Sequence, residues 1–427
     1  MSFRTHPFGE LGKLLLLVSD FDWRYRFMKK IVWISPYIPY DTVRHAGGQI
    51  HNYYIKKLVQ SGKFEVRLVS SYLPEEIESF TLNKSIRCDL ICNYDKGLKK
   101  IIRNGLDVGR LFFPFDRYGN QKTLYNEILM TRILRGYKKE GFIPDILIVE
   151  WTQSLLSLDC FRRIFPNAKI IGIEEDVTIQ ALTRKWERAI GIQKVLAKIR
   201  LQNIKREEIR ILKECDIIIV NNVKDEELLK QYGFDKNVKR WVPFYHRYDD
   251  IHNVYDNKII YYGDMRRREN YTAAEWFIRE VMPALADKDV VFQVIGSNPP
   301  EELKGMESDN VQVTGYIADI KPFFETALCM IAPLSLGAGI KIKVLEGMSA
   351  GLPVLTNEIG IEGIPAVDER DFMFCKTNED YVSSIIKLLN GDVDPIEVAM
   401  SAKALLDESF NFEKSANQFI KWVEDLR

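Results

Sequence analysis

Short apolar runs rich in β-branched residues alternate with longer stretches of helical periodicity along most of the chain. Strands are predicted at residues 30–35, 65–70, 145–150, 169–173 and 216–220 in the first half, and at 258–262, 290–295, 311–314, 328–333, 353–356 and 372–375 in the second. Strands that alternate with helices are typical of parallel, doubly wound sheets. Because the pattern occurs twice, it predicts two Rossmann-like α/β domains in tandem.

The 427 residues fit two domains, since single hydrophobic cores stop growing near ~250–300 residues. Residues 241–257 lose periodicity and gather Pro, Asp, Asn and aromatic residues, which predicts a linker. The expected parts are an N-terminal extension (1–27) without a role in the fold, an N-terminal domain (28–240), the linker (241–257), a C-terminal domain (258–410) and a C-terminal helix (411–427). Met28 leads directly into a strand and is the expected natural start.

Composition limits the function classes. Sixty Lys and Arg residues balance sixty Asp and Glu residues, so no global field favours nucleic acid, and no nucleic-acid partner is expected. The six cysteines are scattered and lack the spacing of a zinc site, which predicts free thiols in the cytoplasm. The apolar run Leu14–Val18 is far shorter than the ~20 residues that span a bilayer.

The strongest chemical signal lies between Pro333 and Gly351. A predicted strand ends at Pro333, a loop with Gly337 and Gly339 follows, and Lys341 begins a helix that ends before Gly351. Glycines let a backbone approach a ligand closely, and the first N–H groups of a helix favour an anion. The segment therefore predicts a phosphate site, while a simple tight turn remains the alternative.

Charged residues in the same segment extend this prediction. Lys341 and Lys343 add positive charge that could receive a diphosphate, and Glu346 could accept hydrogen bonds from two ribose hydroxyls. We predict Lys341 and Lys343 as the cations that stabilise the leaving diphosphate, and as donor contacts Gly337, Gly339, Ile340 and Glu346. The alternative is that both lysines lie on a solvated helix face.

These residues form a G-x-G-x-K-x-K-x-x-E pattern that resembles the donor-binding segment of retaining glycosyltransferase family 4, the glycosyl transferases of group 1. The resemblance implies a GT-B fold, in which two Rossmann-like domains face each other across a cleft, a nucleotide-diphosphate sugar as donor, retention of configuration, and neither cofactor nor metal. One position departs from the family. Many members carry an acidic residue eight positions before the glutamate, where this chain has Ala338.

Two further segments resemble the family's second domain. Gly263 follows a predicted strand and precedes the cluster Arg266, Arg267 and Arg268, which could contact phosphate. Tyr316 and Ile317 follow a strand-ending glycine. In members of the family, the loop at this position lies beside the nucleotide base. A surface charge run and a plain strand end are the respective alternatives.

In the first domain, Gly47 and Gly48 begin a predicted helix at residues 49–59 and resemble the family's glycine loop near the donor phosphates. His51 on that helix is interpreted as an ordinary helix residue.

Acidic residues end two strands of this domain, with Glu150 on one and Glu174 to Asp176 on the next. Related proteins commonly read Glu-His-Asp at the second position, so Glu174 and Asp176 match while Glu175 replaces the histidine. Both are predicted to bind acceptor hydroxyls or take a proton. An acidic helix cap is the alternative.

The sequence thus predicts a glycosyltransferase that moves a sugar from a nucleotide-diphosphate sugar to a glycan or lipid-linked acceptor. Two other functions stay open, a catalytically silent GT-B subunit, suggested by Ala338 and Glu175, and a nucleotide-sugar epimerase. Asp392 and Asp394 resemble a metal-binding D-x-D pair but follow a helix, so they are interpreted as a loop.

A peripheral contact with the inner membrane face is a further hypothesis. Residues 96–113 and 194–213 interleave Lys and Arg with apolar residues, a mixture that favours anionic lipid surfaces. The alternative is two helices whose apolar faces join the core.

Overall fold

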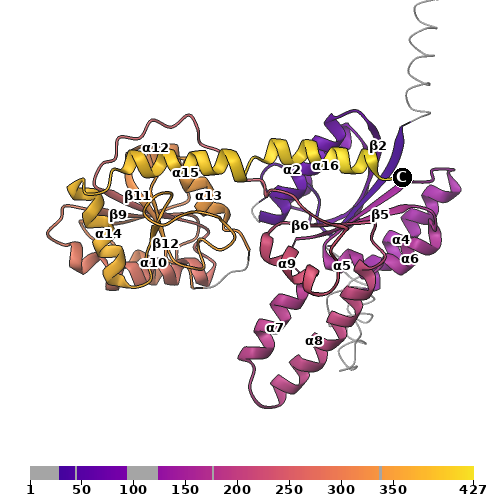
Figure 1. Ribbon diagram of the computed structural model, residues 1–427, viewed down its shortest axis with the longest axis horizontal. Coiled ribbons are helices and arrows are strands. Elements are labelled where there is room, and N and C mark those ends of the chain that lie inside the picture. The colour runs from indigo at the N-terminus through magenta and orange to yellow at the C-terminus, as the bar shows by residue number, and fades with distance from the viewer. Residues whose placement is uncertain (1–27, 44–45, 94–123, 176, 336–338) are drawn as a thin grey trace, which may run out of the picture. The chain divides into compact units, whose positions relative to one another are not determined.

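The computed structural model describes residues 28–43, 46–93, 124–175, 177–335 and 339–427. The chain forms two compact units. Unit 1 runs to Val220 and also contains Leu229–Lys239 and Ala416–Arg427, and unit 2 contains Asn221–Leu228 and Arg240–Ser415. Each unit has one β-sheet with helices on both faces (Figure 1).

The sheet of unit 1 has the order β3-β2-β1-β4-β5-β6-β7, and the pairings from β3 to β6 are parallel. Its strands are β1 (Lys29–Ser35), β2 (Phe64–Tyr72), β3 (Arg87–Cys92), β4 (Ile146–Glu150), β5 (Lys169–Glu174), β6 (Ile217–Val220) and β7 (Val238–Arg240). The helices are α2 (Ala46–Gln60), α4 (Leu124–Lys139), α5 (Thr152–Leu155), α6 (Leu158–Ile164), α7 (Thr178–Arg188), α8 (Gly191–Leu212) and most of α16 (Phe412–Asp425). Helix α9 (Val223–Gln231) belongs to unit 2 up to Leu228 and to unit 1 from Leu229.

The five strands expected in this half are confirmed, and two were missed. Both missed strands, β3 and β7, lie at the edges of the sheet. β3 keeps mostly half-exposed side chains, and β7 is three residues long. Edge strands need no continuous apolar run, so hydrophobic patterning does not reveal them.

Large aromatic side chains fix the C-terminal helix on unit 1. Buried Phe419 of α16 lies edge-on to Trp33 of β1 and to Tyr54 of α2, with ring centroids 5.9 and 5.8 Å apart. The amine of Lys29 also donates to the carbonyl of Leu426 at 2.8 Å. The last residues of the chain therefore belong to the core of unit 1, although α16 begins in unit 2.

The sheet of unit 2 has the order β10-β9-β8-β11-β12-β13, with every pairing parallel. Its strands are β8 (Lys258–Tyr262), β9 (Val291–Ile295), β10 (Val311–Gly315), β11 (Ala327–Ala332), β12 (Val354–Thr356) and β13 (Met373–Phe374). The helices are α10 (Arg268–Glu280), α11 (Glu301–Lys304), α12 (Lys321–Thr326), α13 (Ile342–Ser349), α14 (Asn378–Asn390) and α15 (Pro395–Ser409).

Alternate residues of β8 pack into two separate hydrophobic clusters, one on each face of the sheet. Ile259 packs in one cluster with Phe277 of α10, and Ile260 packs in the other with Leu345 of α13. Helices therefore cover both faces of this parallel sheet, as its near-continuous apolar strands require. The predicted class, two doubly wound α/β units, is confirmed.

The predicted linker contains no helix or strand, yet it packs as part of unit 2. Trp241 and Tyr245 are fully buried, and the indole of Trp241 donates to the side-chain oxygen of Asn221. The backbone N–H of His246 donates to the carboxylate of Glu346 at 3.3 Å. The aromatic residues that suggested a linker are therefore core residues, and the segment supplies one group of the site below.

Candidate functional site

The helix α13 is held directly against the sheet of unit 2. Its residues Val344, Leu345 and Met348 are buried on the apolar side. A Cβ placed on Gly347 would lie 2.6 Å from the terminal methyl of Met330 in β11, so a larger residue here would force the Met330 side chain to move. The helix follows the carboxyl end of β11, the edge at which open parallel sheets bind ligands.

Lys343 on this helix points toward the carboxyl end of β8. Its Nζ lies 3.1 Å from Oδ1 of Asn270 and 3.5 Å from the hydroxyl of Tyr261. A Cβ on Gly263 would lie 2.9 Å from Nδ2 of Asn270 and 3.1 Å from Nζ of Lys343. The glycine after β8 is therefore required by the close approach of these two polar side chains.

The Lys343 side chain is half-buried, and its hydrogen-bond partners are neutral. Burial, helped by the nearby Arg267 charge, lowers the pKa of Lys343 from 10.5 to about 8, and the charges of Glu346 and Glu269 oppose this fall. Among the described residues, the partners are the amide of Asn270 and the hydroxyl of Tyr261. A partly desolvated cation with neutral hydrogen-bond partners gains stability when an anion binds beside it. The geometry is that of a candidate anion site.

Glu346 lies one helical turn from Lys343 and is buried. Its carboxylate accepts hydrogen bonds from the hydroxyl of Tyr262 and the backbone N–H of His246. Burial raises the pKa of Glu346, and the Tyr262 hydrogen bond opposes that rise. A carboxylate in this environment has lone pairs suited to further hydroxyl donors.

Lys341 turns away from Lys343 toward a different partner. Its Nζ donates to the carbonyl of Gly339 and lies 3.4 Å from a carboxylate oxygen of Glu362, which also pairs with Lys224 at 2.7 Å. The predicted pair of lysines is thus divided between two groups.

The loop before α13 is only partly described. Gly339 has φ +69, a backbone conformation that favours glycine, and Ile340 packs close to Gly363. Gly337 and Ala338 lie outside the described residues.

The arginine cluster begins α10, where all three side chains are exposed. Arg266 pairs with Asp264 and Arg267 with Glu269. Arg267 is the one whose charge reaches Lys343.

At the end of β10, Gly315 has φ +70 and Tyr316 is 77% exposed, whereas Ile317 packs partly against the core. The two residues predicted to contact the base therefore differ in exposure, and Tyr316 is the one whose aromatic ring is open to solvent.

In unit 1, Gly47 and Gly48 occupy the first turn of α2. A Cβ on Gly47 would lie 3.0 Å from the ring of Trp151 and 3.3 Å from Oε2 of Glu175. Gly47 thus lies close to Glu175, the residue that follows Glu174 at the end of β5. Glu174 ends β5, is 1% exposed and accepts a hydrogen bond from Thr152 at 2.5 Å. Asp176 lies outside the described residues.

The acidic-cap alternative does not hold for Glu174. The first amides of α7, those of Thr178 and Ile179, donate to the carboxylate of Glu208 at 2.9 and 3.2 Å. Glu208 is a buried residue of α8. The helix start is therefore satisfied from α8, and Glu174 bonds Thr152 instead.

A buried cluster of polar side chains connects β1, α2 and β4. Its central residue, His51, was predicted only as an ordinary helix residue. Nδ1 of His51 lies 3.3 Å from the hydroxyl of Ser35, and Nε2 lies 3.4 Å from Oε2 of Glu150. The same oxygen accepts from the indole of Trp33 at 2.8 Å. Burial, and then the charge of Glu175, raise the pKa of Glu150 well above 4.5. The available signal was the position of His51 one helical turn after Gly47.

Residues 256–391 match the family model described as glycosyl transferases group 1. The chain is a glycosyltransferase. The matched region runs from β8 through α14 and contains Gly263, Lys343 and Glu346. Comparison with curated proteins finds no match.

Solved structures of similar fold support a GT-B glycosyltransferase. Sucrose-phosphate synthase from Thermosynechococcus elongatus has a TM-score of 0.62 at 16% identity, over 93% of this chain and 98% of that one. HepE from Anabaena, in complex with UDP and glucose, has 0.60 at 11%, over 93% and 100%. TarM has 0.60 at 12%, over 92% and 98%. The predicted GT-B fold is confirmed, while family 4 and retention stay predictions.

In the part of the glycosyltransferase that the structure describes, no helix is long and apolar enough to cross a membrane. The described residues also contain no group of three or more His, Cys, Asp or Glu residues that could hold a metal ion.

Proposed function

We propose that this glycosyltransferase moves a sugar from a nucleotide-diphosphate sugar to a glycan or lipid-linked acceptor, with retention and without a metal ion. The observation that carries the proposal is the half-buried Lys343 ammonium, which lies beside Gly263 with the buried Glu346 one turn away. An ammonium of this kind needs an anion, and a diphosphate provides one next to a ribose that the carboxylate can bind.

In this proposal, Lys343 binds the donor diphosphate and stabilises the charge that develops as the sugar leaves, which is the largest contribution in such chemistry. Glu346 accepts hydrogen bonds from the ribose, and Tyr316 and Ile317 edge the base. Lys341 contributes to diphosphate binding when a phosphate group replaces Glu362 as its ion-pair partner. The structures of HepE and TarM in complex with UDP support a nucleoside diphosphate as the ligand class.

The acidic residues of unit 1 act on the acceptor in this proposal. Glu174 and Asp176 bind acceptor hydroxyls, and Glu175 stands where related proteins commonly have histidine. Glu150 then holds a proton more readily than an exposed carboxylate, because burial and the charge of Glu175 both raise its pKa. The protonated form of such a carboxyl group can donate a hydrogen bond.

A thermal-shift screen over nucleotide-diphosphate sugars, followed by product analysis with the stabilising donor, tests this function. We expect one donor to stabilise the protein and its sugar to appear on an added glycan or lipid-linked acceptor. Conversion of the donor sugar without an acceptor would indicate an epimerase. Binding without any turnover, across a panel of acceptors, would indicate a silent subunit.

The proposed location is the cytoplasm, with a peripheral contact at the inner membrane face. Of the two segments that suggested this contact, residues 96–113 lie outside the described residues. The other segment, 194–213, covers most of α8 and the one residue that follows the helix, Lys213.

A further inference from the structure

Helices α7 and α8 leave the sheet of unit 1 as a hairpin (Figure 1). They pack against each other and are joined by Ala189 and Ile190, followed by Gly191 with φ +58. The buried residues of α8 begin only at Ile204, so its first three turns do not contribute to the core. The end of the hairpin is a structure without a packing role of its own.

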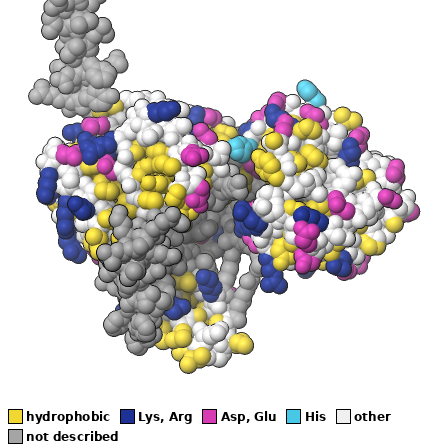
Figure 2. All heavy atoms as spheres, turned by 180° about the vertical axis from the view of Figure 1, so that it is seen from behind, with side chains coloured by type: hydrophobic (Ala, Val, Ile, Leu, Met, Phe, Trp, Pro, Cys, Tyr) yellow, Lys and Arg dark blue, Asp and Glu magenta, His cyan; other side chains and the backbone are white. Residues whose placement is uncertain are grey.

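Four aliphatic side chains are exposed at this end. Ile190 is 81% exposed, Ile192 77%, Val195 58% and Leu196 38%. Figure 2 shows hydrophobic side chains gathered at the lower end of the hairpin, with Lys or Arg side chains nearby. Single exposed aliphatic residues are common on protein surfaces, but four within seven positions form a patch that indicates an interaction.

Positive charge surrounds this patch. Residues 178–206 contain eight Lys or Arg residues and one acidic residue, Glu187. Lys185, Lys194, Lys198 and Arg200 are exposed on the two helices. Aliphatic side chains between basic ones suit a bilayer of anionic phospholipids, which has an apolar interior beneath negatively charged headgroups. A polyanion alone would leave the aliphatic residues without a function.

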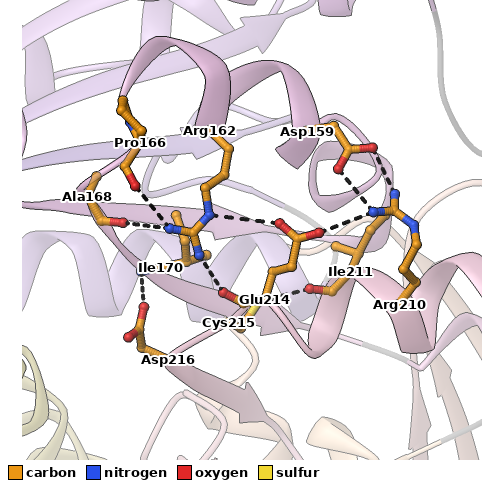
Figure 3. Close-up of polar contacts among 10 residues, drawn as sticks. All are labelled: Asp159, Arg162, Pro166, Ala168, Ile170, Arg210, Ile211, Glu214, Cys215 and Asp216. Carbon is orange, nitrogen blue, oxygen red and sulfur yellow. Dashed lines mark hydrogen bonds and ion pairs between the residues drawn. The ribbon is translucent and has the colours of Figure 1, made fainter.

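The other end of the hairpin is firmly attached. Arg210 of α8 pairs with Asp159 of α6 at 2.8 Å, and Arg162 of α6 donates to the backbone carbonyl of Glu214 at 2.9 Å (Figure 3). Glu208 caps α7. A fixed base lets the end of the hairpin transmit binding to unit 1 as a whole.

We infer that the end of the α7–α8 hairpin docks onto an anionic lipid surface. Ile190, Ile192 and Val195 enter the headgroup region, while Lys194 and Lys198 contact lipid phosphates. This inference deepens the peripheral contact proposed above and does not depend on the sugar-transfer site. Its test measures binding, so its failure is distinguishable from a failure of the proposed activity.

The experiment is flotation of the full chain with vesicles of phosphatidylglycerol and phosphatidylcholine, compared with pure phosphatidylcholine. We expect binding to the anionic vesicles at low salt, and at least tenfold weaker binding at high salt or on neutral vesicles. The double variant Ile192→Glu, Val195→Glu should lose at least tenfold in affinity. The matched control is Val254→Glu in unit 2, which replaces a side chain exposed to 67% and should bind like the parent.

A second measurement locates the contact. Lys194 lies 5.8 Å from the ring of Trp186, so Trp186 reports on this end of the hairpin. Brominated lipids should quench a fluorescence component that the Trp186→Phe variant lacks. Equal binding to neutral vesicles, no binding at low salt, or binding unchanged in the double variant would each overturn the inference. So would a concentration-dependent dimer of the parent that the double variant abolishes, because a second copy would then be the partner.

Discussion

Lys343 is destabilised by its surroundings in the ligand-free protein. Its pKa is about 8 when folded, against 10.5 for an ordinary lysine, and burial is the main cause. Between these values the unfolded chain binds more protons than the folded chain, so this group makes stability rise with pH from about 8 to 10.5. Below pH 8 the folded protein carries the full cost of the buried charge.

Replacing Lys343 by methionine should therefore stabilise the ligand-free protein at pH 7. The expected gain is on the order of 1 kcal/mol, or about 2–4 °C in Tm, because a buried charge is exchanged for an apolar side chain of similar shape. Differential scanning calorimetry measures it, with the exposed Lys304→Met as control. A lower Tm for Lys343→Met would show that the lysine is structural.

In unit 1, Glu150 is a buried ionisable residue whose pKa is shifted. Glu150→Gln keeps an oxygen that can accept the Trp33 hydrogen bond but removes the titrating group beside Glu175 and His51. We expect sugar transfer to fall at least ~10-fold and the pH–rate profile to change, since this titration is lost. Affinity for the nucleotide should stay at the parent value, because Lys343 and Glu346 lie in unit 2. An unchanged pH profile would leave Glu150 with a packing role only.

At the scale of elements, the turn after β8 has the most specific requirement. Gly263→Ala would place a methyl group against Asn270 and Lys343, at 2.9 and 3.1 Å. The lysine must shift, so nucleotide affinity should fall about tenfold or more while the fold remains. Gly136→Ala in α4 meets nothing within 4 Å and should leave affinity unchanged. Equal affinities for the two variants would mean that Lys343 does not contact the ligand.

Hydrophobic patterning predicted the central strands because they are buried on both faces and need continuous apolar runs. The same patterning did not predict the edge strand β3 or the three-residue β7, because their solvent-exposed positions can be polar. The glycine and charge spacing around α13 placed Lys343 and Glu346 on one helix. No local pattern could show that Lys341 turns to Glu362, or that His51 meets Glu150, because those contacts join residues far apart in the sequence.

At the scale of the whole molecule, two doubly wound units divide the proposed chemistry between donor and acceptor. Positive charge from Lys343 and the start of α13 takes the place of a divalent ion at the diphosphate in this account. Chelation with EDTA, followed by assay of sugar transfer, should leave the rate within about twofold of the untreated enzyme. Restoration of activity by added magnesium or manganese would contradict this prediction.

Calorimetric titration with the nucleoside diphosphate of the active donor tests whether Lys343 binds the donor diphosphate. At pH 7 we expect a single site in the parent and at least tenfold weaker binding for Lys343→Met and Glu346→Ala. Parent affinity should fall about tenfold from pH 7 to pH 9, because a lysine with a pKa near 8 is then mostly neutral. The Lys343→Met variant should lack this pH dependence. Parent-like affinity in both variants, with the same pH response, would contradict the assignment of the site.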